Sequence, residues 1–406
     1  MTRAYYTRRA RRGADTGRAR QVSRAPRTSR ASGWIRAALP GAVVLAVAVG
    51  ATAVGGTAPA VAVSVTSQAA VKTTTSTWRI VLARRFGAAT AESGFDAVIA
   101  HKKDAWFFGG TNFAGPGHPL IEHRLDGHWH TALLPGQLPS WITAASAVSP
   151  KSVWAVGYLG GYVLTWNQLG WTRVASGGWA PGTQFTGIDA ITKHDVWVFG
   201  SGGRHRGAGT WHLTGTTWGK VGGIAGDIYS ASDLSATSIW AIGGIKGTQN
   251  AVEYYDGAKW RHVTARALSG LRFSFVLAQA PDDVWLAGSI RQKGKNRPKL
   301  VHWNGKHWVR IAVPGAVTPT GITSDGSGGI WVVANQRSGP PYLLRRSGSG
   351  KWRLVKIGSS SATRISAVAV IPGSDSVWGA GFSPAKTGRK AAIYLTGTTG
   401  LAARPS

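Results

Sequence analysis

The chain has 406 residues, of which 47 are Lys or Arg and 16 are Asp or Glu, and it contains 20 tryptophans and no cysteine. Because hydrophobic residues make up 43% of the chain and charged residues only 16%, it can bury a large core and is not disordered throughout. The lack of cysteine excludes a disulfide scaffold, a Cys-ligated zinc site and a thiol nucleophile. The 56 glycines favour short strands and tight turns over helices.

The N-terminal part has the order of an export signal. Residues 1–36 contain eleven arginines and one acid, a composition that predicts a disordered leader. Residues 37–62 contain an uncharged run of Ala, Val and Leu that ends in small residues. This order predicts a signal peptide cleaved after Ala60 or Ala62, with an uncleaved membrane-anchoring helix as the alternative. In both cases the arginines stay cytoplasmic, the rest is exported, and only this helix contacts the membrane. Residues 63–75 are expected to form an exposed linker.

A repeated motif organises residues 76–400. It consists of a small or acidic residue, an aliphatic residue, Trp, two apolar residues and usually Gly, as in Asp195-Val-Trp197-Val-Phe-Gly200. The motif occurs seven times, centred on Trp106, Trp154, Trp197, Trp240, Trp285, Trp331 and Trp378. Successive tryptophans are 43 to 48 residues apart, and a period of this length built from short strands is typical of a propeller blade.

A second motif follows the first Trp by 17 to 23 residues, as in Asp126-Gly-His-Trp129 and Asn304-Gly-Lys-His-Trp308. Asp-Gly and Asn-Gly are expected to form hairpin turns, because both residues tolerate positive φ. Each repeat therefore predicts four antiparallel strands, A to D from the axis outward. In the third repeat, strands A to D are predicted at residues 185–191, 196–200, 209–213 and 218–221.

The ends of the repeat region predict a closed ring. The seventh repeat ends near Gly400 without a final Trp strand, and the missing strand lies at the front of the region, at residues 76–81. Donating this strand to the last repeat would close the ring and remove exposed edges. We therefore expect an all-β, seven-bladed β-propeller over 76–400, closed by its N-terminal strand and followed by a tail at 401–406. A closed ring without free strand edges favours a monomer.

The two motifs resemble those of Trp-rich secreted β-propeller repeat proteins of high-GC Gram-positive (actinobacterial) bacteria, which are functionally uncharacterised. The resemblance covers about residues 76–400. It implies a secreted or surface-exposed propeller and carries no established reaction.

The motif tryptophans are expected to pack between neighbouring blades rather than to form a carbohydrate platform. Trp141 and Trp179 differ, because they break the repeat and lie in predicted D-to-A connections. These connections open on the face where propellers usually bind ligands. Both residues are therefore candidates for stacking against a sugar, with packing inside the loop as the alternative.

Charge is the more informative feature of the exported part. Residues 37–406 hold 36 basic and 15 acidic side chains, and the predicted B-to-C loops are basic without any acid, whereas the A-to-B turns hold aspartates. Because B-to-C loops and D-to-A connections share one end of a propeller, this rim should be strongly positive. Arg272 and Arg364, at the starts of two inner strands, would add charge near the channel. The predicted ligand-binding residues are Arg204, Arg206, Lys246, Arg272, Arg291, Lys293, Lys295, Arg297, Arg337, Arg364, Lys386, Arg389, Trp141 and Trp179.

A basic rim predicts a binding module for an anionic polymer of the cell envelope or the extracellular space, such as a cell-wall polysaccharide or a teichoic-type polymer. One alternative is that these residues only keep the protein soluble, and a second is a scaffold for a protein partner. A third is a glycan hydrolase or lyase that uses Asp96 and Asp189, two acids on inner strands. His123, His128 and His130 surround one hairpin, but exposed histidines are favoured over a metal site, so we predict no metal and no cofactor.

Overall fold

The computed structural model describes residues 72–73, 78–86, 92–102, 104–111, 117–175, 177–180, 182–201, 209–224, 226–245, 248–292, 295–314, 318–335, 341–357 and 363–396. These residues all belong to one unit, Pro40–Ser406. The predicted leader, the predicted apolar helix and the predicted tail lie outside the described residues. Among the residues that are described, no helix is long and apolar enough to cross a membrane.

The described residues form seven sheets, here called blades 1 to 7, whose strands A to D run from the axis outward. Blade 1 comprises β3 (Ser93–Ala100), β4 (Ala105–Thr111), β5 (His118–Leu125) and β6 (His128–Thr131). Blade 2 comprises β7 (Ile142–Ser149), β8 (Ser152–Gly157), β9 (Tyr162–Trp166) and β10 (Trp171–Arg173). Blade 3 comprises β11 (Gln184–Thr192), β12 (Asp195–Ser201), β13 (Trp211–Thr214) and β14 (Thr217–Lys220). Blade 4 comprises β15 (Gly226–Ser235), β16 (Ser238–Ile245), β17 (Thr248–Tyr255) and β18 (Trp260–Val263).

The remaining blades have the same order. Blade 5 comprises β19 (Leu271–Ala280), β20 (Asp283–Gln292), β21 (Lys295–Trp303) and β22 (Trp308–Ile311), and a short 3₁₀ turn, η2 (Arg266–Leu268), precedes it. Blade 6 comprises β23 (Thr318–Ser324), β24 (Ile330–Asn335), β25 (Tyr342–Arg346) and β26 (Trp352–Lys356). Blade 7 comprises β27 (Arg364–Val370), β28 (Val377–Pro384), β29 (Arg389–Leu395) and β2 (Arg79–Arg84).

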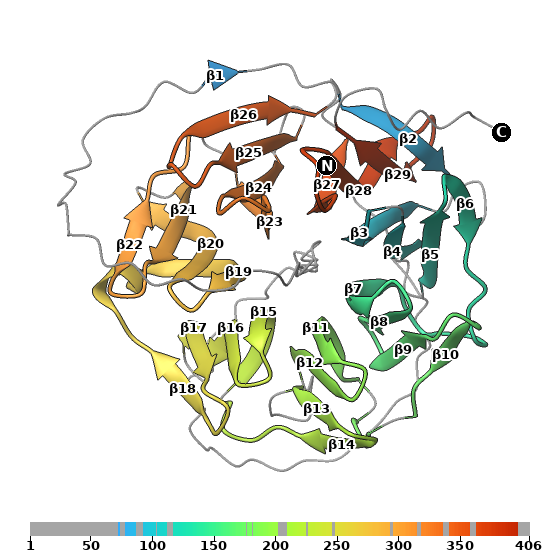
Figure 1. The fold of residues 1–406 in the computed structure, drawn as a ribbon, viewed down its shortest axis with the longest axis horizontal. Helices are drawn as coiled ribbons and strands as arrows, with labels where there is room; N and C mark the ends of the chain where they lie inside the picture. The colour runs from blue at the N-terminus through green and yellow to red at the C-terminus, as the bar shows by residue number, and fades with distance from the viewer. Residues whose placement is uncertain are drawn as a thin grey trace, which may run out of the picture. The chain divides into compact units, whose positions relative to one another are not determined.

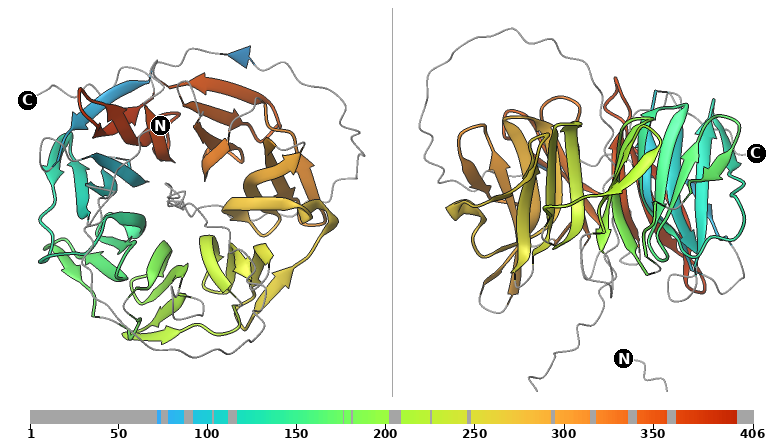
Figure 2. Two further views of the ribbon diagram at one scale, coloured as in Figure 1. Left: turned by 180° about the vertical axis from the view of Figure 1, so that it is seen from behind. Right: turned by 90° about the horizontal axis from the view of Figure 1, so that it is seen from below.

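The blades stand around a central axis, and each strand A faces that axis (Figure 1). Successive inner strands contact one another around the whole circle, including β27 against β3. The side view in Figure 2 shows the strands running along the axis rather than across it. The prediction of a seven-bladed β-propeller is confirmed, and the strands predicted for the third repeat agree with β11 to β14 to within two residues.

The N-terminal strand closes the ring as predicted. β2 takes the outer position of blade 7 and pairs antiparallel with β29, with Arg79 opposite Leu395 and Arg84 opposite Ala391. Trp78, just before β2, packs against the apolar cluster that contains Tyr394 and Trp331. Blade 7 is therefore built from both ends of the repeat region, which joins the ring.

The prediction that the ring leaves no free strand edge is wrong. Among the described residues, the outer strands of six blades each keep one unpaired edge, whereas the edge of blade 6 is used by the chain itself. β1 (Lys72–Thr73), in the predicted linker, pairs with β26 in the parallel direction, with Lys72 opposite Arg353. Blade 6 therefore has five strands, and its outer edge accepts an extended segment.

The glycine that ends the repeated motif is required by a close approach of two strands. A Cβ atom on Gly200 of β12 would lie 2.0 Å from the carbonyl oxygen of Gln184 on β11. The equivalent Gly243 would place a Cβ atom 2.1 Å from the carbonyl oxygen of Asp227. Only glycine lets the inner strand approach this closely, which explains why the motif usually ends in this residue.

The motif tryptophans pack between blades as predicted. Trp197 of blade 3 is 2% exposed, and its ring centroid lies 5.1 Å from Tyr255 and 6.0 Å from Trp260 of blade 4. Trp378 of blade 7 makes the same kind of edge contact with Phe107 of blade 1, at 5.5 Å. The aromatic rings thus form the interfaces between blades and present no open platform.

The C-to-D turns differ in detail from the prediction. Asp126 and Gly127 both have positive φ, of 48° and 92°, as a two-residue hairpin turn requires. In blades 4 and 5 the turns are longer, and of the motif pair only the glycine has positive φ. There the Asp256 or Asn304 side chain instead accepts hydrogen bonds from backbone N–H groups two and three residues ahead, at 2.8–3.1 Å.

Candidate functional site

The inner strands carry a ring of polar side chains at one level of the channel. Each inner strand has a β-bulge near its start, where one residue is inserted between two paired positions. The inserted residues are Asp96, Thr143, Thr186, Tyr229, Ser274, Thr320 and Ser366. The hydroxyl groups of Thr143 and Thr186 donate to carbonyls of the following blade, at 3.1 and 2.6 Å. The bulges therefore link neighbouring blades, and Asp96 is the carboxyl in a ring of hydroxyl groups.

Asp96 is buried in this ring. It is 8% exposed, and Ser366 of blade 7 is its hydrogen-bond partner. Burial raises the pKa of Asp96 to about 7, although the bond with Ser366 opposes the shift. As the pH rises through neutrality, the Asp96 carboxyl therefore loses its proton and becomes a buried negative charge.

Blades 3 and 4 meet at a second buried acid. Asp189 lies three residues after the bulge of β11, the position that Ser146 holds in blade 2 and Ser232 in blade 4. The hydroxyl groups of these two serines accept the N–H of Ala190 and Ala278 in the following blade, at 3.0 and 2.8 Å. A carboxyl thus stands at a position where the neighbouring blades use a hydroxyl.

The neighbour of Asp189 across the interface is another acid, Asp233 of β15. Asp189 is 4% exposed, and its Oδ2 has no hydrogen-bond partner among the described residues. Burial and the charge of Asp233 raise the pKa of Asp189 well above its ordinary value. Burial, and less strongly the charge of Asp195, raises the pKa of Asp233 to about 6. The two acids therefore keep their protons to higher pH than ordinary aspartates do.

The two predicted catalytic carboxyls have different neighbours in the described structure. Asp96 on blade 1 bonds with blade 7, whereas Asp189 on blade 3 faces blade 4, and blade 2 lies between the two acids. A hydrolytic pair needs two acids about 5–10 Å apart on either side of one bond. The acid that accompanies Asp189 is instead Asp233, buried in the interface between two blades.

On the end of the ring with the A-to-B and C-to-D turns, here called the A–B face, aspartates pair with histidines. His212 Nε2 donates to Asp195 Oδ1 at 2.8 Å, and its ring stacks on Trp197 with centroids 3.9 Å apart. Blade 5 repeats this arrangement with His302, Asp283 and Trp285, at 2.8 Å and 4.0 Å. This recurrent Asp–His–Trp contact ties strands B and C together, and it was not predicted from the sequence. Its signal was present, because each histidine follows its aspartate by 17 or 19 residues.

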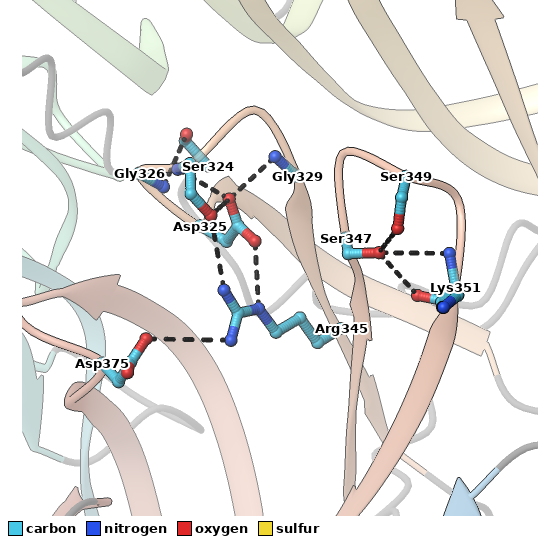
Figure 3. A network of polar contacts seen from close by, with 10 residues as sticks. Ser324, Asp325, Gly326, Gly329, Arg345, Ser347, Ser349, Lys351 and Asp375 are labelled. Atoms are coloured by element: carbon cyan, nitrogen blue, oxygen red, sulfur yellow. Dashed lines mark hydrogen bonds and ion pairs between the residues drawn. The ribbon is translucent and has the colours of Figure 1, made fainter.

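Blade 6 uses an arginine in the same place (Figure 3). Arg345 Nε lies 3.0 Å from Asp325 Oδ2, and its guanidinium lies 5.5 Å from the centre of the Trp331 ring. Burial alone would raise the pKa of Asp325, but the N–H groups of Ser327 and Gly329 and the guanidinium lower it overall. The A–B face is therefore rich in acids that already have hydrogen-bond or ionic partners inside the protein.

The histidines of the first blade lie around one hairpin as predicted. His123 stacks on Trp106 at 3.5 Å, and His128 and His130 are exposed on β6. Burial, followed by the charges of His130 and His101, lowers the pKa of His123 to about 4. No group of three or more His, Cys, Asp or Glu side chains in the described part of the chain is arranged to hold a metal ion.

The opposite end of the ring, here called the B–C face, carries exposed arginines on blade 5. Arg272 on β19, Arg291 on β20 and Arg297 on β21 are all exposed. The strand register puts them on three consecutive rungs of the sheet, because Arg297 lies opposite Ile290, between the rung of Arg291 and the rung on which Arg272 lies opposite Ser289. Within the described residues, none of the three arginines forms an ion pair.

Blade 7 carries a second basic group on the same face. Its members are Arg85, Arg364, Lys386, Arg389 and Lys390. Burial and the nearby charge of Arg389 lower the pKa of Arg364, so these two cations lie close together. Arg389 Nε lies 3.8 Å from Glu92 Oε1, and the guanidinium of Arg85 donates to the Thr387 carbonyl. Together with the blade 5 arginines these residues are here called the basic rim.

The acids of the ring are sorted away from the basic rim. Glu92 and Asp227 are the acids at the B–C ends of described strands. The acids at the A-to-B and C-to-D turns are Asp104, Asp126, Asp195, Asp256, Asp282, Asp283, Asp325 and Asp375. The A–B face also holds lysines, such as Lys102, Lys193 and Lys306, and is therefore mixed in charge.

The two predicted sugar-stacking tryptophans do not belong to the basic rim. Trp179 is 8% exposed, its indole N–H donates to the Gly161 carbonyl, and it contacts Phe185 edge to face, so its ring is part of the core and cannot stack on a sugar. Trp141 is half-buried and stacks on Tyr158 at 5.2 Å. Predicted residues outside the described residues, or described only by their backbone, are Arg204, Arg206, Lys246, Lys293, Lys295 and Arg337.

The comparisons with known proteins agree with the fold and go no further. No protein-family model matches the chain, and no curated protein matches it. Among solved structures, a catalytically inactive variant of virginiamycin B lyase from Staphylococcus aureus with quinupristin is 13% identical, with a TM-score of 0.57, and the match covers 79% of this chain and 100% of the lyase. YCF48 bound to D1 peptide is 13% identical, with a TM-score of 0.54 and coverage of 80% and 97%.

A GH74 xyloglucanase from Xanthomonas campestris is 14% identical, with a TM-score of 0.54, and the match covers 75% of this chain and 52% of the enzyme. At these identities the likeness shows a shared β-propeller fold, and the neighbours differ widely in function. The function of this chain has to be argued from its own surface.

Proposed function

We propose that the chain is an exported β-propeller of the Trp-rich repeat type, and that its basic rim binds an anionic polymer of the cell envelope or the extracellular space. The observation that supports this most is the sorting of charge. Exposed arginines on two blades face one end of the ring, while the turn acids lie at the other end and are largely bonded internally. Solubility alone would not require this separation.

The arrangement suits a polymer better than a compact anion. The blade 5 arginines and the blade 7 group lie on two blades separated by blade 6, so one small ligand would reach only one of them. A chain with repeated phosphate or carboxylate groups can contact both, and each contact releases counterions. The proposed ligand is therefore long, flexible and regularly charged.

A protein partner is the second candidate function. It is supported by one structural neighbour, YCF48, which is bound to D1 peptide. A protein partner recognised by shape would be less sensitive to salt than a polyanion, and salt therefore separates the two candidates.

The test is retention of the full-length chain on isolated cell wall, teichoic acid, heparin and DNA at increasing salt. We expect retention on at least one of these polymers that is lost by about 0.3 M salt, where the screening length is below 10 Å. A triple variant of the blade 5 arginines, Arg272→Ser, Arg291→Ser and Arg297→Ser, should elute earlier than the natural protein.

The control removes the same charge from the other end of the ring, with Lys102→Ser, Lys193→Ser and Lys306→Ser. These lysines are exposed on the A–B face, so the control should elute like the natural protein. Equal effects of the two triple variants would mean that net charge rather than the basic rim matters. Retention on none of the polymers at low salt would rule the proposal out.

A further inference from the structure

A groove lies on the outer side of the ring between blades 3 and 4, away from the basic rim. It has a volume of about 530 Å³, and its lining includes Trp197, His212, Gly219 and Lys220 of blade 3. Tyr255 and Lys259 of blade 4 line the other side. The groove is bordered by the edge of β14, the outermost strand of blade 3.

The groove is open because of one glycine. Gly219 lies opposite His212 in the pairing of β13 and β14, and a Cβ atom there would approach only the His212 carbonyl oxygen, at 4.0 Å. In other blades the residue after the outer-strand Trp has a side chain. These residues are His130, Thr172, Arg261, Val309 and Arg353. Blade 5 resembles blade 3 most at this position, because Val309 lies opposite His302 as Gly219 lies opposite His212.

The groove combines apolar walls with unpaired positive charge. Tyr255 is half-buried and contacts Trp197 and Trp260, which also line the groove. Lys220 and Lys259 are exposed, and neither ammonium group lies in an ion pair among the described residues. An occupant that complements this site is apolar at its centre and negatively charged on either side.

The strand edge beside the groove indicates how such an occupant would bind. An edge strand exposes alternating N–H and C=O groups that can pair with an added strand. The ring already shows this mode once, because β1 adds to the outer edge of β26 in blade 6. β14 has the same outermost position in blade 3, and no described strand pairs with its outer edge.

We propose that this groove and the edge of β14 bind an extended acidic peptide segment of a partner protein, which adds to blade 3 as a fifth strand. In this arrangement an apolar side chain of the peptide covers Gly219 and contacts Tyr255. Flanking Asp or Glu side chains pair with Lys220 and Lys259. The backbone pairing supplies affinity, and the match of apolar and acidic side chains to the groove and its lysines supplies specificity.

The test is selection of a randomised seven-residue peptide library on the full-length protein, followed by affinity measurement by fluorescence anisotropy. We expect enriched peptides in which acidic residues flank an apolar residue. Gly219→Val fills the groove with the side chain that blade 5 carries, and it should weaken binding of these peptides by about tenfold or more. Methylation of alternate peptide nitrogens should weaken it similarly, because it removes strand pairing.

A second variant tests the charges independently of the groove's shape. Lys220→Glu with Lys259→Glu should also reduce affinity by about tenfold or more. Lys351→Glu is the matched control, because Lys351 precedes the outer-strand Trp352 of blade 6 as Lys259 precedes Trp260. Thermal unfolding of each variant shows that the fold is retained.

Three results would overturn the proposal. The first is a selection that enriches no peptide above an unrelated protein. The second is a set of enriched peptides that bind Gly219→Val as tightly as the natural chain. The third is binding that is lost in the blade 5 arginine variant and kept in Gly219→Val, because the peptides would then occupy the basic rim.

Discussion

Asp96 makes the most quantitative prediction, because a buried acid couples folding to pH. Its pKa is about 7 in the folded protein, against 3.8 for an ordinary aspartate. The folded state therefore binds the proton more tightly than the unfolded state, and stability is lost as the pH rises from the lower value to the higher. At about 1.36 kcal/mol per pKa unit, the loss from Asp96 totals about 4 kcal/mol above neutral pH. About 3 kcal/mol of it falls between pH 5 and pH 8.

Asp96→Asn removes the ionisation and keeps a side chain of the same shape beside Ser366. We expect this variant to be more stable than the natural protein at pH 8. The difference in their free energies of unfolding should be about 3 kcal/mol larger at pH 8 than at pH 5. Asp96→Thr should behave similarly, since Thr143, Thr186 and Thr320 hold the same bulge position in other blades. Urea unfolding followed by tryptophan fluorescence measures the difference at both pH values. A gain that is the same at pH 5 and pH 8 would refute the reasoning, because it would show that Asp96 does not titrate in this range.

The other predictions concern single contacts of the ring and can be measured by the same unfolding assay. Asp189→Ser introduces the hydroxyl that Ser146 and Ser232 supply at this position in the neighbouring blades. It should raise the urea midpoint of unfolding more at pH 8 than at pH 5. A larger effect at pH 5 would contradict the raised pKa values of Asp189 and Asp233. His302→Ala removes the bond to Asp283 and the stacking on Trp285, so it should lower the free energy of unfolding by about 1–3 kcal/mol. The control, Thr165→Ala at the same position of blade 2, should lower it by less than about 1 kcal/mol. Equal losses would mean that the Asp–His contact contributes nothing. Gly200→Ala should lower the free energy of unfolding by about 3 kcal/mol, because its Cβ atom would clash with the Gln184 carbonyl. Gly187→Ala should leave it nearly unchanged, because its Cβ atom would approach no atom closer than 3.7 Å.

The ring itself could be predicted from the sequence because its signal is repeated. A Trp every 43 to 48 residues defines the blade, and the incomplete seventh repeat indicates the closing strand at the front. Both features follow from packing between blades, since Trp197 and its equivalents have to meet the aromatic residues of the next blade. A pattern enforced seven times by the same contact survives variation in any one blade.

Features that depend on contact between different blades were harder to predict. The contact of Asp189 with Asp233 depends on how β11 packs against β15 of the next blade, which no single repeat records. Asp96 and Asp189 looked similar in sequence as inner-strand acids, yet their neighbours lie in opposite directions around the ring. The addition of β1 to blade 6 rests on backbone pairing of two residues and leaves no side-chain pattern.

The Asp–His contacts fall between these two cases. The co-occurrence of Asp195 with His212 and of Asp283 with His302, each around the motif Trp, is visible in the sequence once the strand pairing is known. Without that pairing, the histidines look like isolated polar residues. The basic rim was easier to predict, because loop position alone assigns its residues to one face of a propeller.

The proposed function is tested most directly by the salt dependence of binding to whichever polymer retains the protein. If the blade 5 arginines contact the polymer, removing all three should reduce the slope of log affinity against log salt by about 2 to 3. The triple variant of Lys102, Lys193 and Lys306 should leave the slope unchanged. A slope that is the same in the natural protein and in both variants would contradict binding at the basic rim.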